Sequence, residues 1–463
     1  MRPSPLNLSL ALMMTSLISG FTLPTQANNL QDVYTFALEN DHQLKADEAA
    51  YHATKEAIIV GRSGLLPQVT ATASASRSSY DNLTSGIAGT AHVNTDNDSY
   101  DVTLTQPLFD MPAWFGYQQG AELSKLGEAQ FSADQQSFIL RVAERYFDVL
   151  RSIDNMNTAK AEEKALSHQL VQTKQRFEVG LTDITDVLES QAAFDNTTSN
   201  TLETVGNVDI AFDALEALTG HEHHQIAPLH NHYPVTNPIP TKRSDWVDFA
   251  LQHNHSLKIA QLSAASAKHN ARSKSSSHLP TVTSSYTYTQ RNDTDTTSNG
   301  GTNSGSRLND GETVAISLQV PIFSGLRTSG ERREAHALRM QADELVNKTQ
   351  RDIIQSVRSL YLSVIIDAAQ VKASQQAVIS SQSALDATQA GYNEGTRNLV
   401  DVLVSQQNLH QSQRNYDNAR YDYIINTLNL KAAAGTLSPE DIMKLNEWLD
   451  TEGSYQRSND QRL

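Results

Sequence analysis

The sequence contains no cysteine, which excludes disulfide bonds, thiolate chemistry and a lipid-bearing N-terminal cysteine. Aromatic residues make up only 6% of the chain and hydrophobic residues only 38%, a composition too polar for a large compact core. The net charge of −16 argues against nucleic acid as a partner, because phosphate binding requires a basic surface. We therefore expect a long, thin molecule with much polar surface.

Long apolar runs are also missing. Beyond the N-terminal region no stretch of about 18 apolar residues occurs, so no membrane-spanning helix is expected. The short apolar run Leu6–Ile18 follows Arg2 and precedes Thr25-Gln26-Ala27, which predicts a secretory signal peptide over residues 1–27. An exported chain that crosses a membrane without helices must use strands closed into a barrel.

The chain does contain a clear internal repeat. The segment Arg176–Gln191, RFEVGLTDITDVLESQ, has a near-twin in Gly391–Gln406, GYNEGTRNLVDVLVSQ. Each copy turns at a glycine, Gly180 or Gly395, and restarts with the pattern DVLxSQ. Two copies of one turn predict a duplicated helical hairpin.

The duplication divides the chain into four parts after the signal peptide. We expect a first repeat over residues 28–220 and a second repeat over residues 244–435. A linker over residues 221–243 joins them and is expected in the equatorial region of the molecule. Residues 436–463 are expected to form a short equatorial helix, Pro439–Leu449, followed by a mobile polar tail.

Hydrophobic periodicity gives both repeats one order of elements: helix, strand pair, long helix, turn, helix. A helical pattern over Leu30–Arg62 changes to strict alternation over residues 68–75, which indicates a strand with two different faces. The polar segments Asp81–Ser99 and Asn292–Gly311 are expected to be loops between paired strands.

Each repeat also contains a very long helical run. Neither Glu128–Val179 nor Glu331–Ala390 contains glycine or proline, which predicts helices of about 78 Å and about 90 Å. Phe131, Phe138, Val142, Tyr146 and Val149 recur at steps of seven, four and three residues, a spacing that is typical of a coiled-coil seam.

Four strands cannot close a membrane barrel, because the smallest spanning barrels have about eight strands. Open strand edges are not tolerated in lipid. Several copies must therefore combine their strands, and three copies would contribute twelve. Helices leaving one mouth of such a barrel would form a long tube.

Nine short motifs occur along the chain in an order that matches a known family. Together with the duplication they make the chain resemble the TolC family of outer-membrane efflux and secretion channels, over essentially the whole mature sequence. The motifs are Leu65-Leu66-Pro67, Gln106–Phe109, Val179–Thr182, Ile184–Val187, Val320–Phe323, Gly395–Arg397, Val400–Leu403, Asn418–Tyr421 and Leu428–Lys431.

The resemblance implies an α+β membrane protein: a homotrimer whose twelve-stranded barrel lies in outer-membrane lipid and continues into a twelve-helix periplasmic α-barrel. It implies export of drugs, bile-salt-like compounds or secreted proteins from a Gram-negative cell. An inner-membrane efflux pump or ABC exporter and a periplasmic adaptor (a membrane fusion protein) would open the tunnel. No cofactor is implied.

The resemblance also implies a latch at the tunnel entrance, formed by Tyr392 and Arg397 of the second turn and Thr185 and Asp186 of the first. Arg397 can pair with Asp186 in fork geometry, and Tyr392 can donate a hydrogen bond to it. Exposed pairs of this kind contribute about 0.2–1 kcal/mol each, so a docking partner could still overcome three sets. The alternative is that Arg397 and Asp186 only stabilise helix ends.

Asp401 is expected to line the entrance as an acidic ring. Relatives often carry a second aspartate one turn later, where this chain has Val404. We therefore expect a cation preference that is weaker than with two rings. The alternative is an aspartate placed in the first helical turn by the helix dipole.

The same turns are expected to meet the adaptor, through Gly180, Leu181, Gly395 and Thr396. The two glycines are expected to adopt backbone conformations that other residues resist.

The linker is rich in histidine, and His221, His223 and His224 are its candidate metal ligands. Their spacing fits no standard site, so a solvated loop is the interpretation we prefer. No motif for nucleophilic catalysis or phosphate binding stands out, and an enzyme is not expected. An exported structural or adhesive coiled-coil rod without transport is the alternative function, which the alternating strands disfavour.

Overall fold

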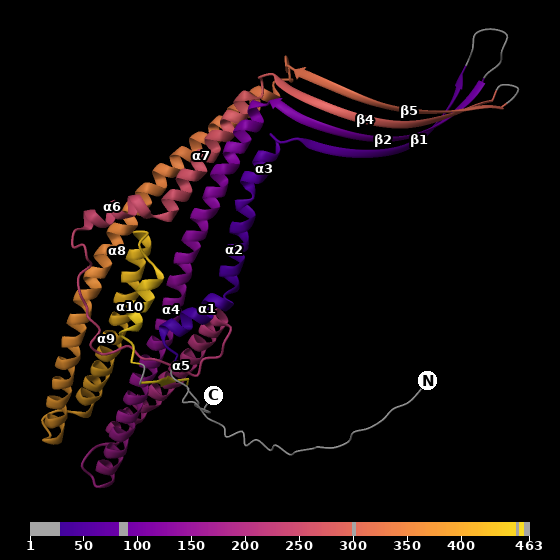
Figure 1. Cartoon of the computed structure of the whole chain (residues 1–463). Helices are drawn as coiled ribbons and strands as arrows, with labels where there is room; N and C mark the ends of the chain where they lie inside the picture. The colour runs from indigo at the N-terminus through magenta and orange to yellow at the C-terminus, as the bar shows by residue number, and fades with distance from the viewer. Residues whose placement is uncertain (1–27, 83–90, 299–301, 451–452, 458–463) are drawn as a thin grey trace, which may run out of the picture.

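The structure is a computed structural model that describes residues 28–82, 91–298, 302–450 and 453–457. Long helices run side by side, and a sheet curves away from one end of them (Figure 1). The first repeat contains α1 (Leu30–Asn40), α2 (His42–Lys55), α3 (Ala57–Ser63), β1 (Gln68–Asn82), β2 (Ala91–Phe109), α4 (Met111–Glu178) and α5 (Ile184–Thr219). The remaining elements are β3 (Gln225–Ile226), α6 (Arg243–His253), α7 (His255–Ser276), β4 (Thr281–Ser298), β5 (Thr302–Gln319), α8 (Arg327–Asn393), α9 (Leu399–Ala433), α10 (Pro439–Asn446) and β6 (Tyr455–Gln456).

The two longest helices, α4 and α8, contain 68 and 67 residues and are about 100 Å long. The helix α4 begins at Met111, well before the glycine-free run expected from Glu128, whereas α8 begins at Arg327, close to the expected Glu331. In α4 the helix passes through Gly120, where a Cβ atom would lie 2.4 Å from the carbonyl oxygen of Ala57 in α3. Glycine is kept there to admit a neighbouring helix rather than to end α4. No helix in the described part of the chain is long and apolar enough to span a membrane.

The first helical segment is interrupted, contrary to the single helix expected over Leu30–Arg62. Asp41 has extended backbone angles between α1 and α2, and its carboxylate accepts a hydrogen bond of 2.8 Å from the Gln43 amide. Asn254 separates α6 from α7 in the same way, accepting a bond of 3.1 Å from the Leu257 amide. A short polar side chain that caps the next helix breaks the segment in both repeats.

The four long strands form one antiparallel sheet in the order β1-β2-β4-β5. They extend through most of the polar segments that were expected to be loops, so that expectation is wrong for residues 81–82, 91–99, 292–298 and 302–311. Residues 83–90 and 299–301 lie outside the described residues. Polar cross-strand pairs support this part of the sheet, including the Arg77–Asp96 ion pair with 2.5 Å between Nε and Oδ1.

The sheet has two unlike faces near the helices, as the alternation predicts. Tyr286 pairs with Leu104 on one side and Val314 on the other, which makes an apolar row across the strands. Thr103 and Thr287 are paired on the opposite face, with 3.1 Å between their hydroxyl oxygens. The apolar row is Val69, Leu104, Tyr286 and Val314, and the neighbouring row on the other face is Thr70, Thr103, Thr287 and Thr313.

The main core lies part-way along the helices, where α4, α5 and α9 meet α1, α10, the linker and the strand pair β3–β6. We call α1, α10, the linker, β3 and β6 together the belt. Tyr146 of α4 is fully buried there, and its hydroxyl donates a bond of 2.7 Å to the Ala227 carbonyl. The belt therefore holds one face of the helical layer.

Both ends of the described chain join the belt at the same two-residue strand. Asn28 forms a parallel bridge with Ile226, and β6 pairs antiparallel with β3. Arg457 contacts Asp209 and Asp213 of α5 at 3.2 and 2.7 Å. Residues 453–457 are thus fixed in place, in contrast to the mobile tail expected from the sequence, and α10 ends at residue 446 rather than 449.

Candidate gate at the helix tips

The turns that end α4 and α8 have one backbone geometry. At the first turn the Leu181 amide donates to the Arg176 carbonyl at 2.8 Å. At the second turn the Thr396 amide donates to the Gly391 carbonyl, also at 2.8 Å. Both are six-residue closures that satisfy the last free carbonyls of a helix.

The glycines in these turns adopt the left-handed conformation expected from the sequence. Gly180 and Gly395 both have φ of +76°, which is strained for residues with a Cβ atom. Nothing lies within 4 Å of a Cβ atom built at either position. Backbone conformation, and not crowding, therefore explains glycine at both tips.

The two tip residues that follow these glycines are open to solvent. Leu181 is 68% exposed, and Thr396 is also exposed while its hydroxyl donates to the Gly391 carbonyl at 3.0 Å. Leu181 continues an exposed apolar patch with Val179 and Ile184. The first tip is thus apolar and the second is polar.

Tyr392 lies inside a small apolar cluster with Leu399 and Val402 and is only 7% exposed. The Arg176 guanidinium of the first repeat lies over its ring, 4.8 Å from the ring centre. The Tyr392 hydroxyl and the Arg176 Nε are both buried without a hydrogen-bond partner in the described part of the chain. The two repeats therefore meet at the tips through a cation–π contact.

Asp186 is partly buried and accepts a hydrogen bond from the Thr182 hydroxyl, four residues earlier. Thr185 is exposed. Within one chain, the described residues do not bring Arg397 or the Tyr392 hydroxyl to Asp186. The pairings implied by the family resemblance are not formed inside a single copy.

Arg397 instead forms an ion pair with Asp401, with 3.7 Å between Nη1 and Oδ2. Its side chain is 62% exposed and that of Asp401 39% exposed, so this pair contributes little to stability. The Asp401 amide donates to the Asn398 side chain at 2.8 Å, and the neighbouring Val404 is exposed. Asp401 thus occupies a first helical turn and carries a salt bridge as well.

The Thr182–Asp186 hydrogen bond and the Arg397–Asp401 ion pair occupy equivalent positions in the two repeats. Thr182 and Asp186 of the first copy occupy the positions of Arg397 and Asp401 in the second. Arg176 corresponds to Gly391, where a Cβ atom would lie 2.8 Å from Cγ of Arg397. Sequence reasoning missed Arg176, although this exchange of arginine for glycine between the copies was visible.

The linker histidines have separate surroundings. His223 is buried, with Nδ1 2.7 Å from the side-chain nitrogen Nδ2 of Asn28 and Nε2 2.7 Å from the Thr219 hydroxyl. Burial, together with the neighbouring His221 and His224, lowers the pKa of His223 to about 4. In the described residues no group of three or more possible metal ligands is assembled. His223 is therefore a neutral buried contact between the linker and residue 28.

A second buried polar cluster ties α4 and α9 to β6. The hydroxyl of Tyr421 donates to Asp154 at 2.5 Å, and Tyr455 also hydrogen-bonds this carboxylate. Burial and the negative charge of Asp154 raise the pKa of Asp417 to about 6. The buried Arg420 guanidinium lies 3.8 Å from Asp417 and donates to the His230 carbonyl at 2.6 Å.

The order of elements and both repeats match a described family. Residues 33–221 and 246–436 match the family described as "Outer membrane efflux protein". The chain is 34% identical over 444 residues to the outer membrane protein TolC of Vibrio cholerae, covering 95% of this chain and 98% of that protein. This chain belongs to the TolC family. It is also 32% identical to TolC of Escherichia coli over 96% of this chain and 89% of that protein.

Other TolC-family proteins extend the comparison. The alkaline protease secretion protein AprF of Pseudomonas aeruginosa is 29% identical over 93% of this chain and 90% of that protein. The Campylobacter jejuni CmeC outer membrane channel has the same fold, with a TM-score of 0.75 at 16% identity, covering 97% of this chain and 99% of that one. The chain is therefore an outer-membrane protein of an efflux and secretion channel family. The resemblance inferred from its motifs is confirmed. A family of efflux and secretion proteins favours transport over the alternative function, a structural rod.

Proposed function

We propose that three copies of this chain form a continuous duct across the outer membrane and into the periplasm. Each copy would contribute its four strands to a twelve-stranded barrel. Its long helices α4, α5, α8 and α9, together with α2, α3 and α7, which pack against α4 or α8, would form its part of the tunnel. The observation that carries this proposal is the two-faced sheet with two open edges, β1 and β5. The apolar row suits lipid and the threonine row suits a water-filled bore.

The free surfaces of a single copy support an oligomer. Val314, Ile316 and Leu318 on the edge strand β5 are largely exposed. An exposed apolar edge strand is a site for pairing with another chain. The helix α8 adds further exposed apolar side chains, which are Leu338, Leu345, Leu362, Ile366 and Ile379.

The names of the relatives support a role in export. AprF and PrtF are named as protease secretion proteins, and CmeC is named as an outer membrane channel. This chain would export drugs, bile-salt-like compounds or secreted proteins when it docks an inner-membrane efflux pump or ABC exporter through a periplasmic adaptor. The adaptor would contact the exposed tips at Gly180, Leu181, Gly395 and Thr396.

The tips would act as the gate. Arg176 and Tyr392 join the two hairpins within each copy by the 4.8 Å cation–π contact. Arg397 is exposed, and it would exchange its weak pair with Asp401 for Asp186 and Thr185 of the adjacent copy. The buried Tyr392 hydroxyl has no partner in the described part of the chain, and in the closed gate it would donate to Asp186.

Asp401 would form a single acidic ring at this entrance, one carboxylate from each copy. Arg397 lies beside each carboxylate and would offset part of its charge. The exposed Val404 adds no charge one turn later. We therefore expect a moderate preference for cations.

The oligomer and the duct are tested together. The mass of the purified protein in detergent should correspond to three chains, and its reconstitution in planar bilayers should give discrete conductance steps. A monomeric mass with no channel activity would overturn the proposal. A trimer without conductance would leave assembly standing and contradict the duct.

A further inference from the structure

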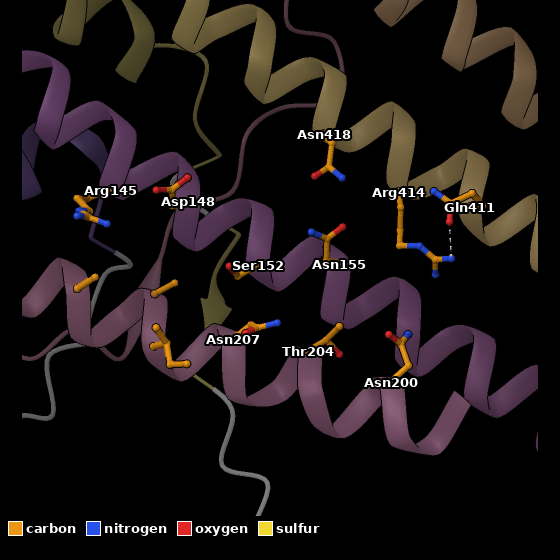
Figure 2. Close-up of a pocket in the computed structure, with 13 residues that line it drawn as sticks. Arg145, Asp148, Ser152, Asn155, Asn200, Thr204, Asn207, Gln411, Arg414 and Asn418 are labelled. Atoms are coloured by element: carbon orange, nitrogen blue, oxygen red, sulfur yellow. Dashed lines mark hydrogen bonds between the residues drawn. The ribbon is translucent and has the colours of Figure 1, made fainter. Parts of the chain in front are cut away.

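A recess of about 500 Å³ lies between α4, α5 and α9, at the level of the belt along α4 (Figure 2). Asn155 of α4, Asn207 of α5 and Asn418 of α9 all line it, so three helices bring amide side chains to one hollow. The gate residues at the helix tips do not contribute to it. The recess is therefore a separate feature from the gate.

The recess and the belt are on opposite faces of α4. Tyr146 and Ile153 belong to the buried face that the belt covers. Arg145, Asp148 and Ser152 line the recess and recur at helical spacing on the other side. Because three belts inside a tube would fill its bore, the belts must lie outside. The recess then opens toward the bore, a placement that rests on the proposed trimeric duct.

The four asparagine amides in the recess are not used by the fold, whereas the Gln411 amide bonds Asn415 and Arg414. The side chains of Asn155, Asn200 and Asn207 have no hydrogen-bond partner in the described part of the chain. The Oδ1 atom of Asn418 is buried and also lacks a partner among these residues. Each primary amide has two donor hydrogens and one acceptor oxygen, so the set can bond a group that both donates and accepts.

The charges in the recess nearly cancel. Arg414 is neutralised by Glu162 of α4, with 2.8 Å between Nη1 and Oε2. Arg145 and Asp148 bring opposite charges to the same wall. A site for an ion would need an excess of one sign, so the ligand that fits is neutral and rich in hydrogen-bonding groups.

The recess is elongated along the helix axis. Its α4 wall runs from Arg145 to Asn155, a distance of about 15 Å at the helical rise. An extended polypeptide covers that distance with about four or five residues. We propose that the recess is a transit subsite that hydrogen-bonds the backbone amides of an extended polypeptide moving through the bore.

The test uses the full-length protein in planar bilayers and two neutral polymers of equal length. One is a glycine–serine peptide, and the other is polysarcosine, whose N-methyl groups remove the backbone donors. Added from the sheet side, the peptide reaches the recess without passing the tips. Blockades by the peptide should last several-fold longer than blockades by polysarcosine, because only the peptide can donate to the carboxamide oxygens.

A triple variant, Asn155→Ala, Asn207→Ala and Asn418→Ala, should shorten peptide blockades to the polysarcosine value while the open conductance is unchanged. The matched control replaces one exposed asparagine on each of the same three helices, none of which lines the recess. Its substitutions are Asn157→Ala, Asn196→Ala and Asn408→Ala. Peptide blockades should retain their length in that control.

Equal blockades by the two polymers in the unmodified channel would overturn the subsite and leave the duct intact. Prolonged blockade by a small neutral carboxamide, with none by the peptide, would also overturn it, because the recess would then select small compounds. A complete lack of conductance would contradict the duct itself, and the two failures are therefore distinguishable.

Discussion

The two tips differ most at a single pair of equivalent residues, Arg176 and Gly391. The arginine reaches across to the Tyr392 ring, and the absent side chain at Gly391 leaves room for the stem of Arg397. Spacing in the sequence identifies the glycines and the first-turn aspartates, because those depend on local helix geometry. It could not identify Arg176 as a partner of Tyr392, because that contact joins residues more than two hundred positions apart.

Arg176→Gln should raise the fraction of time that the channel is open. The substitution removes the cation over the Tyr392 ring while keeping a polar side chain of similar length. Open probability in planar bilayers measures the effect, which we expect to be several-fold. Lys174→Gln is the matched control, since the Lys174 ammonium donates to Gln191 of its own hairpin at 3.1 Å and has no other polar partner among the described residues. An open probability unchanged in Arg176→Gln would remove the cation–π contact from the gate.

The Arg397–Asp401 pair predicts opposite shifts in ion selectivity. Asp401→Asn should weaken the cation preference because the ring loses its carboxylates. Arg397→Gln should strengthen it because the same carboxylates lose their nearest positive charge, 3.7 Å away. The reversal potential in a potassium chloride gradient measures both. Shifts of the same sign in the two variants would contradict the ring.

Among the helices and strands, the repeat order was predictable and several boundaries were not. The alternation near Val69 and the glycine turns at the tips follow from local chemistry and match the structure. The polar part of β5 could not be distinguished from a loop, because its residues pair with polar partners across the sheet. The early start of α4 was missed for a similar reason, since Gly120 serves close packing with α3.

His223 in the belt and Asp417 of α9 have pKa values that move in opposite directions on folding. The pKa of His223 falls from 6.5 to about 4 on folding, so its contribution to stability is complete above pH 6.5 and is lost as the pH falls toward 4. The pKa of Asp417 rises from 3.8 to about 6, so folding is favoured more as the pH falls below 6. The two contributions oppose each other in nearly the same pH window.

We expect substitution of either residue to reveal the pH dependence of stability that the remaining group causes. Asp417→Asn should make the thermal midpoint fall more steeply between pH 6.5 and pH 4 than it does in the unmodified protein. His223→Gln should make the midpoint rise as the pH falls through 6. Melting curves of the detergent-solubilised protein across this window give both slopes. Parallel slopes in all three proteins would show that neither group changes its protonation on folding.

For the molecule as a whole, the C-terminal segment connects the belt to α5. Arg457→Gln should loosen this attachment, because Asp209 and Asp213 lose their shared cation. The cost should be about 1 kcal/mol, since the pairs are partly exposed. Hydrogen exchange at the amides of Ala227 and Arg457, which bond Asn28 and His224, should become faster. Lys348→Gln, at an exposed pair on α8, should leave their exchange unchanged.

The strand Gln225–Ile226 has consequences for the order in which the molecule is completed. Its two neighbours come from opposite ends of the described chain, Asn28 on one side and β6 on the other. A chain delivered from its N-terminus presents Asn28 first, the linker next and β6 only after the whole second repeat. The three-stranded junction cannot form before that moment, so a polypeptide that lacks its C-terminal segment leaves the linker strand without β6 and the α5 aspartates without Arg457. The belt is therefore complete only in a subunit whose C-terminal segment has been delivered.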